Sequence, residues 1–592
     1  MIRISILLIL ALSTSLAPLA AASARPPSGI AVASFAPLNT DIFIADRDGM
    51  NARSLFSGPS QDLNPSFSAD EGWIIFTSDR NGSADIFRAR VDGSEREMLI
   101  DGPAFDDQGA LSPDGKNLAF VSSRNGQADI WILELRTRKL RNLTKHPAGD
   151  FRPAWSPDGK WIAFSSDRDS LKPKGNSGFE TMHSAELYRV RPDGSGFERL
   201  TFRNEFAGSP RWSADGKRLV YYVTQIAEVR KLVSPRDVGG STQIGVIDVA
   251  SKQQEILTSG DGIKISPSFL PDGAIVYAEG RTEGRIRGVS GSIGGKGEFN
   301  SPTWSRDGSR MLFYRNVETA WPPFKPLHSL DKDFALLRTG VFPSYSPGSR
   351  RLLMNDKTAG ILHNSVLIAD VDGNGIRRLY SNDVKSSLAP VWSPKGDRIA
   401  FATGRFFQNI FGPAIADIAI MNSDGTGIKL LTKGDGNYGF PSWSPDERYI
   451  VYRHASREKG GLVIIDLETL ESRVLTDRNH DNFPQWSPRG DVIAFTSNRD
   501  GDYELYTIRP DGSGLTRLTN SPGNDAHSAW SPDGKWIAFS SGRQGFKDEA
   551  VLHARNPQPY GELFVMRADG SDVRMLTDNQ WEEATPAWIG GK

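Results

Sequence analysis

Two histidines in the last quarter of the chain each stand close to an acidic residue. His480 directly precedes Asp481, and His527 follows Asp525 by two residues. Imidazole nitrogens and carboxylate oxygens are common ligands of divalent metal ions. His480, Asp481, Asp525 and His527 are therefore the candidates for a metal site, in which the two histidines would carry any catalytic role. The same residues also fit a polar lining without a metal, because this spacing is a weak signal.

Acidic residues and arginines recur at fixed places in the chain. The acids stand five residues before an aromatic or apolar anchor, at Asp62, Asp106, Asp150, Asp481, Asp525 and Glu583. Arginines follow a strand aromatic by four residues, at Arg80, Arg124, Arg168, Arg499 and Arg543. One interpretation is loop-bracing ion pairs between neighbouring repeats, each contributing at most about 1 kcal/mol where exposed. The other is a binding face whose polar mouth captures a cation, a peptide end or a sugar.

Other catalytic chemistry is largely excluded by composition and motif. The chain has no Cys, which removes disulfides, thiolate metal sites and thiol nucleophiles. The run around Ser290 lacks the last glycine of a nucleophile elbow. The run that starts at Asp370 begins like a calcium loop, but its twelfth position is Ser381 and not Glu. The 70 Lys and Arg nearly balance the 71 Asp and Glu, so no basic nucleic-acid surface is expected.

The elements that must position these side chains follow from an internal repeat. Residues 153–164, Pro-Ala-Trp-Ser-Pro-Asp-Gly-Lys-Trp-Ile-Ala-Phe, show one unit clearly. Its anchor returns 35 to 58 residues apart at Phe67, Leu111, Trp155, Trp212, Phe269, Trp304, Tyr345, Trp392, Trp443, Trp486, Trp530 and Trp588. Each unit predicts four short antiparallel strands, with a Ser-Pro-Asp-Gly turn after the first and an Asp-Gly turn after the third. Such a repeat is typical of a β-propeller blade.

Twelve units exceed the four to eight blades of one propeller, so we expect an all-β chain with two propellers of about six blades. Residues 29–57 look like the last three strands of a unit, and residues 584–588 look like a first strand. We place a signal peptide at 1–24, the first propeller at 25–300 and the second at 301–592. In the alternative, the N- and C-terminal blades share one propeller and the middle blades are inserted as the other.

Long insertions mark one face of the predicted blades. Residues 168–183, 223–241, 405–416 and 543–560 all fit the connection between the second and third strands. Loop variation concentrated on one rim of a rigid scaffold is typical of a binding face. We therefore expect ligands to approach the face that carries these insertions.

The N-terminus predicts export. Arg3 precedes an apolar run from Ile4 to about Ala20, and Ala22-Ser23-Ala24 fits a signal-peptidase site. A transmembrane anchor is the alternative, but the run is short for a span and ends in small residues and proline. We expect a periplasmic or secreted protein with no transmembrane anchor in the mature chain.

The repeat resembles that of the TolB-type propellers. Residues 153–201, 484–519 and 528–577 match the pattern almost throughout. The resemblance implies an exported bacterial propeller, although TolB itself has an α/β domain before a single propeller, and here blade-like strands begin almost at the cleavage site. Similar repeats occur in polysaccharide lyases, in which His and acidic or amide groups hold a metal that acidifies a uronate.

Together these features predict a noncatalytic binding scaffold of the cell envelope. The expected partner is an envelope protein, a peptide or a glycan, and the expected state is a monomer that needs no cofactor and binds no nucleic acid. The competing hypothesis is a metal-assisted polysaccharide or oligouronide lyase with a divalent metal at a propeller mouth, held by His480, Asp481, Asp525 and His527.

Overall fold

The computed structural model describes residues 28–590 apart from 35, 171–183, 203–204, 226–227, 229–240, 281–283, 319–323, 347, 357–364, 383–384, 406–414, 435, 457–459 and 550–560. The expected signal peptide lies outside the described residues. Across the described ranges the strands form ten four-stranded sheets and one eight-stranded sheet. The larger sheet is two blades joined by a single parallel bridge between Ala416 and Asn437. The chain is therefore all-β with twelve blades, as the repeat predicts.

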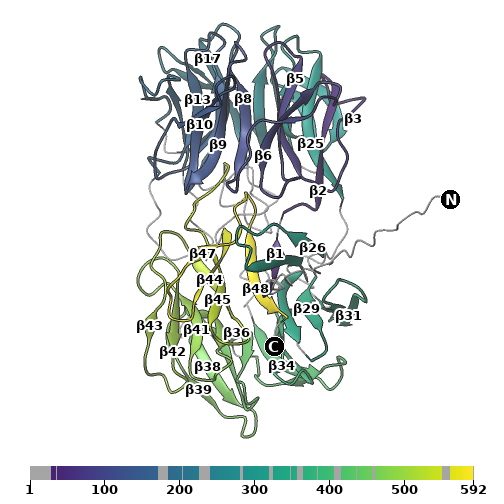
Figure 1. The fold of residues 1–592 in the computed structure, drawn as a ribbon, viewed down its shortest axis with the longest axis vertical. Helices are drawn as coiled ribbons and strands as arrows, with labels where there is room; N and C mark the ends of the chain where they lie inside the picture. The colour runs from purple at the N-terminus through teal and green to yellow at the C-terminus, as the bar shows by residue number, and fades with distance from the viewer. Residues whose placement is uncertain are drawn as a thin grey trace, which may run out of the picture.

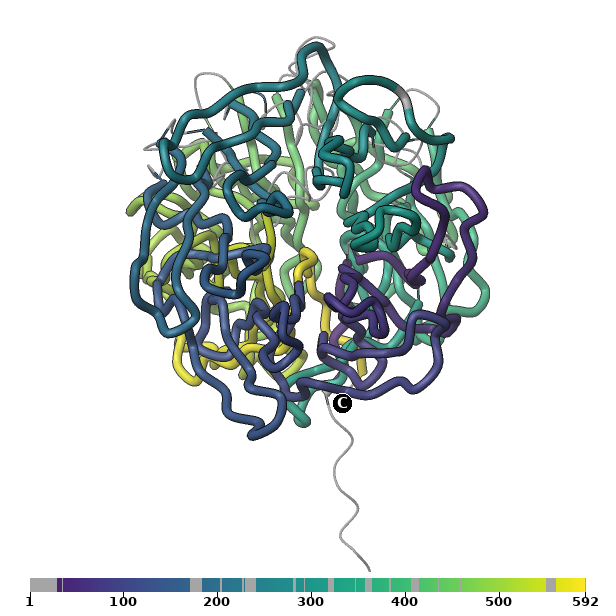
Figure 2. Tube along the Cα trace, turned by 90° about the horizontal axis from the view of Figure 1, so that it is seen from above, coloured from purple at the N-terminus to yellow at the C-terminus, as the bar shows by residue number. Residues whose placement is uncertain are grey.

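Six blades form the first ring, which occupies one end of the long axis of the molecule (Figure 1). Its strands are β2 (Asn39–Asp46), β3 (Arg53–Ser54), β4 (Asp62–Phe67), β5 (Trp73–Ser78), β6 (Asp85–Arg90), β7 (Glu97–Met98), β8 (Asp106–Leu111), β9 (Asn117–Asn125), β10 (Gln127–Glu134), β11 (Lys139–Asn142), β12 (Asp150–Trp155), β13 (Ile162–Ser166), β14 (Glu186–Val190), β15 (Glu198–Arg199), β16 (Phe206–Trp212), β17 (Arg218–Thr224), β18 (Gln243–Asp248), β19 (Gln254–Ile256), β20 (Lys264–Phe269), β21 (Ile275–Glu279), β22 (Gly284–Gly288), β23 (Gly291–Gly297), β24 (Asn300–Trp304) and β25 (Arg310–Glu318). Figure 2 shows these blades around a common axis, with the other ring behind them.

Six further blades form the second ring. Its strands are β1 (Ser28–Ser34), β26 (Lys325–Leu327), β27 (Phe334–Thr339), β28 (Val341–Ser346), β29 (Arg351–Asn355), β30 (Val366–Asp370), β31 (Arg377–Tyr380), β32 (Ser386–Trp392), β33 (Arg398–Gly404), β34 (Ala416–Asn422), β35 (Lys429–Leu430), β36 (Asn437–Trp443), β37 (Tyr449–Ala455), β38 (Gly461–Asp466), β39 (Ser472–Val474), β40 (Asn482–Trp486), β41 (Ile493–Ser497), β42 (Glu504–Ile508), β43 (Thr516–Arg517), β44 (Asp525–Trp530), β45 (Trp536–Ser541), β46 (Glu562–Arg567), β47 (Arg574–Met575) and β48 (Glu583–Ile589).

Each ring is closed by a blade built from distant parts of the chain. In the first ring, β24 and β25 pair with β2 and β3, so the strand pairing places residues 300–318 in that ring and not after a boundary at 300. In the second ring, β1 lies between β27, to which it is parallel, and β48, to which it is antiparallel. Among the N-terminal strands, β1 alone pairs with the C-terminal strand β48, because β2 to β15 lie in the first ring.

The repeated sequence motif explains the local blade structure, as the blade of β12 to β15 shows. The Ser156 hydroxyl donates to Asp158 at 2.7 Å and accepts the Trp161 amide at 3.0 Å, which closes the turn between β12 and β13. Gly159 has a φ of 70°, a left-handed conformation that favours glycine. The indole of Trp155 donates to the Ala110 carbonyl of the preceding blade at 3.0 Å. The anchor aromatic therefore bonds one blade to the next.

The innermost strand of every blade carries a bulge three residues before its anchor. The twelve residues there have φ between 45° and 58°, and the strand register shifts at the same place. In the first ring these residues are polar: Asn64, Gln108, Arg152, Ser209, Ser266 and Ser301. In the second ring most are apolar or aromatic: Phe342, Ala389, Phe440, Phe483, His527 and Thr585. We call the two sets the first channel and the second channel.

The insertion-bearing faces of the two rings are turned toward each other. The Trp581 indole of the second ring donates to Gln61 Oε1 of the first at 3.0 Å. Asp578 Oδ2 accepts the Ser123 hydroxyl at 2.5 Å and the Phe105 amide at 3.2 Å. The face that we expected to be open to ligands is therefore an internal interface along these contacts, and the Ser-Pro-Asp-Gly turns lie on the outward rims.

Candidate functional site

The recurrent acids and arginines form five ion pairs, each inside one blade. The nitrogen to oxygen distances are 2.6 Å for Arg80–Asp62, 2.8 Å for Arg124–Asp106, Arg168–Asp150 and Arg543–Asp525, and 2.9 Å for Arg499–Asp481. The acid side chains are at most 2% exposed, so they hold the arginines of the loops after the second strands and do not line an open mouth. The expectation of pairs between neighbouring repeats is wrong, because both partners flank the first two strands of the same blade.

The sixth acid, Glu583, follows a different arrangement. Its blade takes β1 as second strand, and Ser34 at the end of β1 donates to Glu583 Oε1 at 2.9 Å. Arg338 on β27 supplies the nearby positive charge. Three of the six acids lie in each ring.

The four residues proposed for a metal lie in separate environments. Asp481 and Asp525 are held by their arginines, and His480 Nδ1 lies 3.2 Å from the Tyr503 hydroxyl. His527 packs its ring on Phe483 in the second channel, with ring centroids 4.2 Å apart. In the described part of the chain, no group of three or more His, Asp or Glu is placed to hold a metal ion. These residues do not fit a metal centre, and we assign no chemical step to one.

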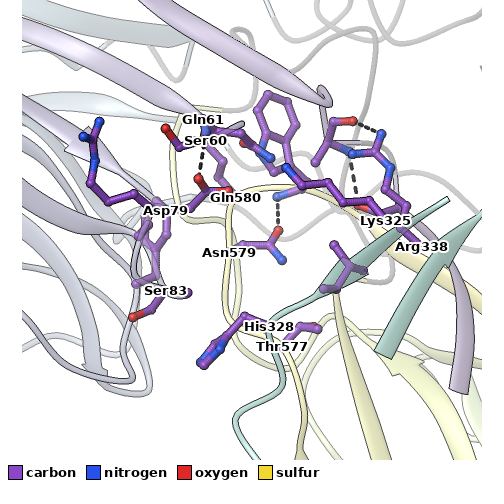
Figure 3. Close-up of a pocket in the computed structure, with 18 of the residues that line it drawn as sticks. Ser60, Gln61, Asp79, Ser83, Lys325, His328, Arg338, Thr577, Asn579 and Gln580 are labelled. Atoms are coloured by element: carbon purple, nitrogen blue, oxygen red, sulfur yellow. Dashed lines mark hydrogen bonds between the residues drawn. The ribbon is translucent and has the colours of Figure 1, made fainter. Parts of the chain in front are cut away.

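A polar cleft between the two rings is the strongest candidate site. It has a volume of about 540 Å³, within the range of ligand sites in proteins. The first ring contributes the loops around 57–63 and 77–84, and the second contributes the segments 325–330 and 577–583. Figure 3 shows lining side chains from both rings: Ser60, Gln61, Asp79 and Ser83 of the first, and Lys325, His328, Arg338, Thr577, Asn579 and Gln580 of the second.

Three buried side chains at this cleft have polar atoms without a hydrogen-bond partner among the described residues. Gln580 is 2% exposed, and neither its amide oxygen nor its amide nitrogen is bonded. Arg338 Nε and Glu583 Oε2 are likewise unbonded, in side chains of residues that are 4% and 1% exposed. A buried polar atom left without a partner costs about 1 to 3 kcal/mol, so each needs an explanation. These atoms lie at one cavity, which makes it a candidate ligand site.

Burial shapes the electrostatics of the cleft. It raises the pKa of Glu583 to about 7, although the carboxylate accepts hydrogen bonds from Ser34 and Asn579. It lowers the pKa of Arg338 to about 10, which leaves the guanidinium charged at neutral pH. Burial also raises the pKa of Asp79, whose Oδ1 accepts the Gln61 amide at 2.7 Å. At neutral pH the cleft thus offers hydrogen-bond donors and acceptors beside the positive charge of Arg338.

Sequence reasoning missed Gln580 and Arg338. Gln580 lies in the connection from β47 to β48, a place where the repeat pattern sets no residue type. Arg338 lies on β27, whose blade is completed only by β1 and β48. The cleft exists because two rings meet, and no local motif encodes that meeting.

Comparison with known proteins gives a consistent match in sequence. The family model of the TolB beta propeller domain, PD40, matches residues 96–232 and 408–588. A protein TolB homolog of Chlorobium luteolum is 34% identical over 290 residues, which cover 48% of this chain and 60% of that protein. An uncharacterized protein of Agrobacterium fabrum is 26% identical over 189 residues, covering 31% of this chain and 59% of the other. The chain thus spans about three fifths of the length of these two relatives.

The solved structures found to be similar share low identity and low TM-scores with this chain. A TolB-assigned protein from Agrobacterium tumefaciens shares 21% identity with a TM-score of 0.37, covering 47% of this chain and 99% of the other. An oligogalacturonate lyase from Vibrio parahaemolyticus shares 10% identity with a TM-score of 0.26, covering 86% of this chain and 96% of the other.

In the described residues, no helix has both the length and the apolar character to cross a membrane.

Proposed function

The chain belongs to the TolB β-propeller domain family, and on that premise we propose that it is a noncatalytic binding protein of the cell envelope whose partner enters the cleft between the two rings. The observation that carries the proposal is the buried amide of Gln580, with both polar atoms unbonded at the wall of a cavity of about 540 Å³. A folded chain tolerates such a group where a ligand completes its hydrogen bonds.

The chemistry of the cleft favours a peptide segment. A primary amide carries both N–H donors and a carbonyl acceptor, so it can pair with the two polar groups of a peptide unit in an extended chain. The wall formed by Ser57, Gly58, Ser60, Gly82 and Ser83 has small side chains, so a ligand backbone can approach closely. The partner that we propose is therefore an envelope protein that presents an extended segment.

Location in the envelope rests on the N-terminal sequence. The charged start, apolar run and small-residue site of residues 1–24 direct export, and the proposed mature protein acts in the periplasm or outside the cell. An exported binding protein meets partners that carry accessible extended segments, which is the chemistry that the cleft matches.

Site-specific crosslinking in cells tests the proposal. A photoreactive amino acid at Ser83, on the cleft wall, is expected to give a discrete adduct with an envelope protein. The same probe at Asp158, on the outward turn of the first ring, is the matched control and is expected to give no such adduct.

The variant Gln580→Leu keeps the shape of the side chain and removes its amide. We expect the Ser83 adduct to fall about tenfold, equivalent to about 1.4 kcal/mol. Equal adducts from Ser83 and Asp158, or an adduct that is insensitive to Gln580→Leu, would show that the cleft is not the binding site.

A further inference from the structure

A segment of the second ring enters the first channel. Residues 543–549 follow β45 of the second ring, yet the Phe546 ring packs against two hydrophobic clusters of the first ring. Lys547 is 1% exposed, and its ammonium lies 2.9 Å from Asp578 Oδ1. In Figure 1 the yellow-green end of the second ring reaches up to the underside of the first. The segment from Phe546 to Glu549, which we call the plug, thus lies in the interior of a ring to which it does not belong.

Asp548 of the plug is bound by Arg152 of the first channel. Arg152 Nε donates to Asp548 Oδ1 at 2.8 Å, and Arg152 Nη2 donates to Oδ2, so the pair is bidentate. Arg152 is fixed in turn by Asn64 Oδ1 and the Ser301 hydroxyl, each 3.1 Å from Nη1. A planar guanidinium held in this way is the usual receptor for a carboxylate in proteins.

Glu549 of the plug is bound by a second set of first-ring donors. Its Oε1 accepts the Ser165 hydroxyl and the Ser209 amide, both at 2.6 Å. Its Oε2 accepts the Ser209 hydroxyl at 2.7 Å and the Tyr222 hydroxyl at 2.8 Å. Four donors from β13, β16 and β17 therefore converge on one carboxylate.

These contacts have the character of ligand recognition. From them we propose that the first channel is a binding site for an acidic peptide segment, and that residues Phe546–Glu549 occupy it as an intramolecular ligand. The ligand class is a peptide with an aromatic residue, one intervening residue and then two consecutive acids, as in Phe546–Glu549. A partner protein with such a segment competes with the plug for Arg152 and Ser209.

The channel has further capacity on its outer side. A cavity of about 320 Å³ opens there, lined by Asn64, Gln108, Arg152 and Arg211. The Arg211 guanidinium donates from Nη1 to the Pro210 carbonyl at 3.5 Å, which is a long contact for a hydrogen bond. A second guanidinium beside Arg152 adds positive charge that attracts an anionic segment.

The test supplies the plug as a separate peptide. In the opened variant, residues 544–549 are replaced by alternating Gly and Ser. The probe is a fluorescent, end-capped peptide of residues 542–549, Gly-Arg-Gln-Gly-Phe-Lys-Asp-Glu, with binding followed by anisotropy. We expect the opened variant to bind the peptide and the wild-type chain to bind it at least tenfold more weakly, because the plug occupies the channel.

Three controls make the binding specific. A peptide with Asn-Gln in place of Asp-Glu, and the opened variant carrying Arg152→Met, are each expected to lose at least tenfold in affinity. A chain with Gly and Ser at 500–502, in the corresponding loop of the neighbouring blade and after the paired Arg499, is expected to behave as wild type. A folded opened variant that does not bind up to about 1 mM peptide, or that binds regardless of Arg152, overturns the proposal.

Should the opened variant fail to fold, the double variant Asp548→Asn, Glu549→Gln decides. It keeps the shape of the plug and removes both charges. The plug should therefore bind the first channel more weakly, while the channel itself is unchanged. Gain of peptide binding relative to wild type supports the proposal, and no gain overturns it. Folding of each variant is checked by circular dichroism and gel filtration.

Discussion

The two channels place the same backbone feature around their axes and surround it with different chemistry. In both rings a residue with positive φ sits three positions before the anchor of each inner strand. In the first channel these positions hold Arg152 and its polar neighbours, and a segment of the other ring fills the space. In the second channel Phe440 and Phe483 pack on each other with centroids 4.5 Å apart.

This difference shows that blade geometry and channel chemistry are set independently. The bulge turns one side chain of each inner strand toward the axis, and the residue type at that place decides what the ring holds there. An aromatic set packs on itself and forms a core, whereas a polar set needs partners for its donors. The polar residues of the first channel therefore depend on the second ring for hydrogen-bond partners. The aromatic residues of the second channel pack on one another.

The largest expected effect comes from removing the cation of the first channel. Arg152→Met leaves the Asp548 carboxylate buried and unpaired, and we expect a loss of about 3 to 5 kcal/mol in the free energy of unfolding. Guanidinium unfolding followed by tryptophan fluorescence measures it. The double variant Arg152→Met, Asp548→Leu should recover most of the loss, and a double variant as unstable as the single one would contradict this account.

The second channel should respond to loss of an aromatic ring. Phe440 stacks with Phe342 and Phe483 and lies under Arg453. Phe440→Ala is expected to lower the free energy of unfolding by about 3 kcal/mol through lost packing. Phe440→Leu, which keeps most of the volume, is the matched control and should cost about 1 kcal/mol. If both substitutions have the same small effect, the aromatic set is not a core.

A smaller effect is expected from the pH dependence of Glu562 on β46. Burial and then the nearby Asp578 carboxylate raise its pKa to about 8, from 4.5. The folded chain thus keeps a proton that the unfolded chain releases, so this stabilisation is complete below about pH 4.5 and is lost as pH rises through about 8. The free energy of unfolding should fall by on the order of 1 kcal/mol for each pH unit between about pH 6 and pH 8, and level off above about pH 8.

Glu562→Gln isolates this contribution because the amide cannot titrate. Its unfolding free energy should change less than that of the wild-type chain over the same pH range, as measured by chemical denaturation at fixed temperature. An identical pH slope in the two chains would assign the effect to another group.

The smallest expected effect at neutral pH is that of His527→Phe in the second channel. Burial lowers the pKa of His527 to about 3, so the ring is neutral in the folded chain and already packs as an aromatic group. We expect a change within about 1 kcal/mol at pH 7.5. Stability linked to this histidine is present above about pH 6.5 and is lost as pH falls toward 3, and the variant should lose less over that range. A steep acid loss that persists in the variant would contradict the assignment.

The blade structure was predictable because each blade is encoded locally. The Ser-Pro-Asp-Gly turn, the anchor at Trp155 and the Leu-Thr end of a unit all act within about 45 residues, so the number of blades and their strands followed from repetition. The positions of the recurrent acids and arginines were found in the same way. Their pairing inside a blade was not, because sequence spacing alone does not say which of two adjacent blades supplies the partner.

The arrangement of the rings and the cleft depends on contacts between distant segments. Residues 30–33 of β1 are apolar and suit the second strand of any blade, and their partners on β27 and β48 are selected by ring closure. The role of Gln580 depends on the face of the other ring lying opposite. The plug could be recognised in the sequence only as an insertion at 543–560, since its ligand-like contacts come from distant residues such as Arg152, which is 396 positions away.

The place of the N-terminal strand β1 in the second ring also imposes an order on folding during biosynthesis. The first ring can close once residues 39–318 have been made, because all its strands come from that stretch. The second ring needs β48, and the contact from Ser34 to Glu583 joins residues 549 positions apart. During synthesis and export, the apolar strand β1 must therefore wait for β27, and its other edge stays unpaired until β48 arrives. The closed first ring then lies in the chain between β1 and its partners. Misassembly or chaperone binding is expected while an edge of β1 is still unpaired.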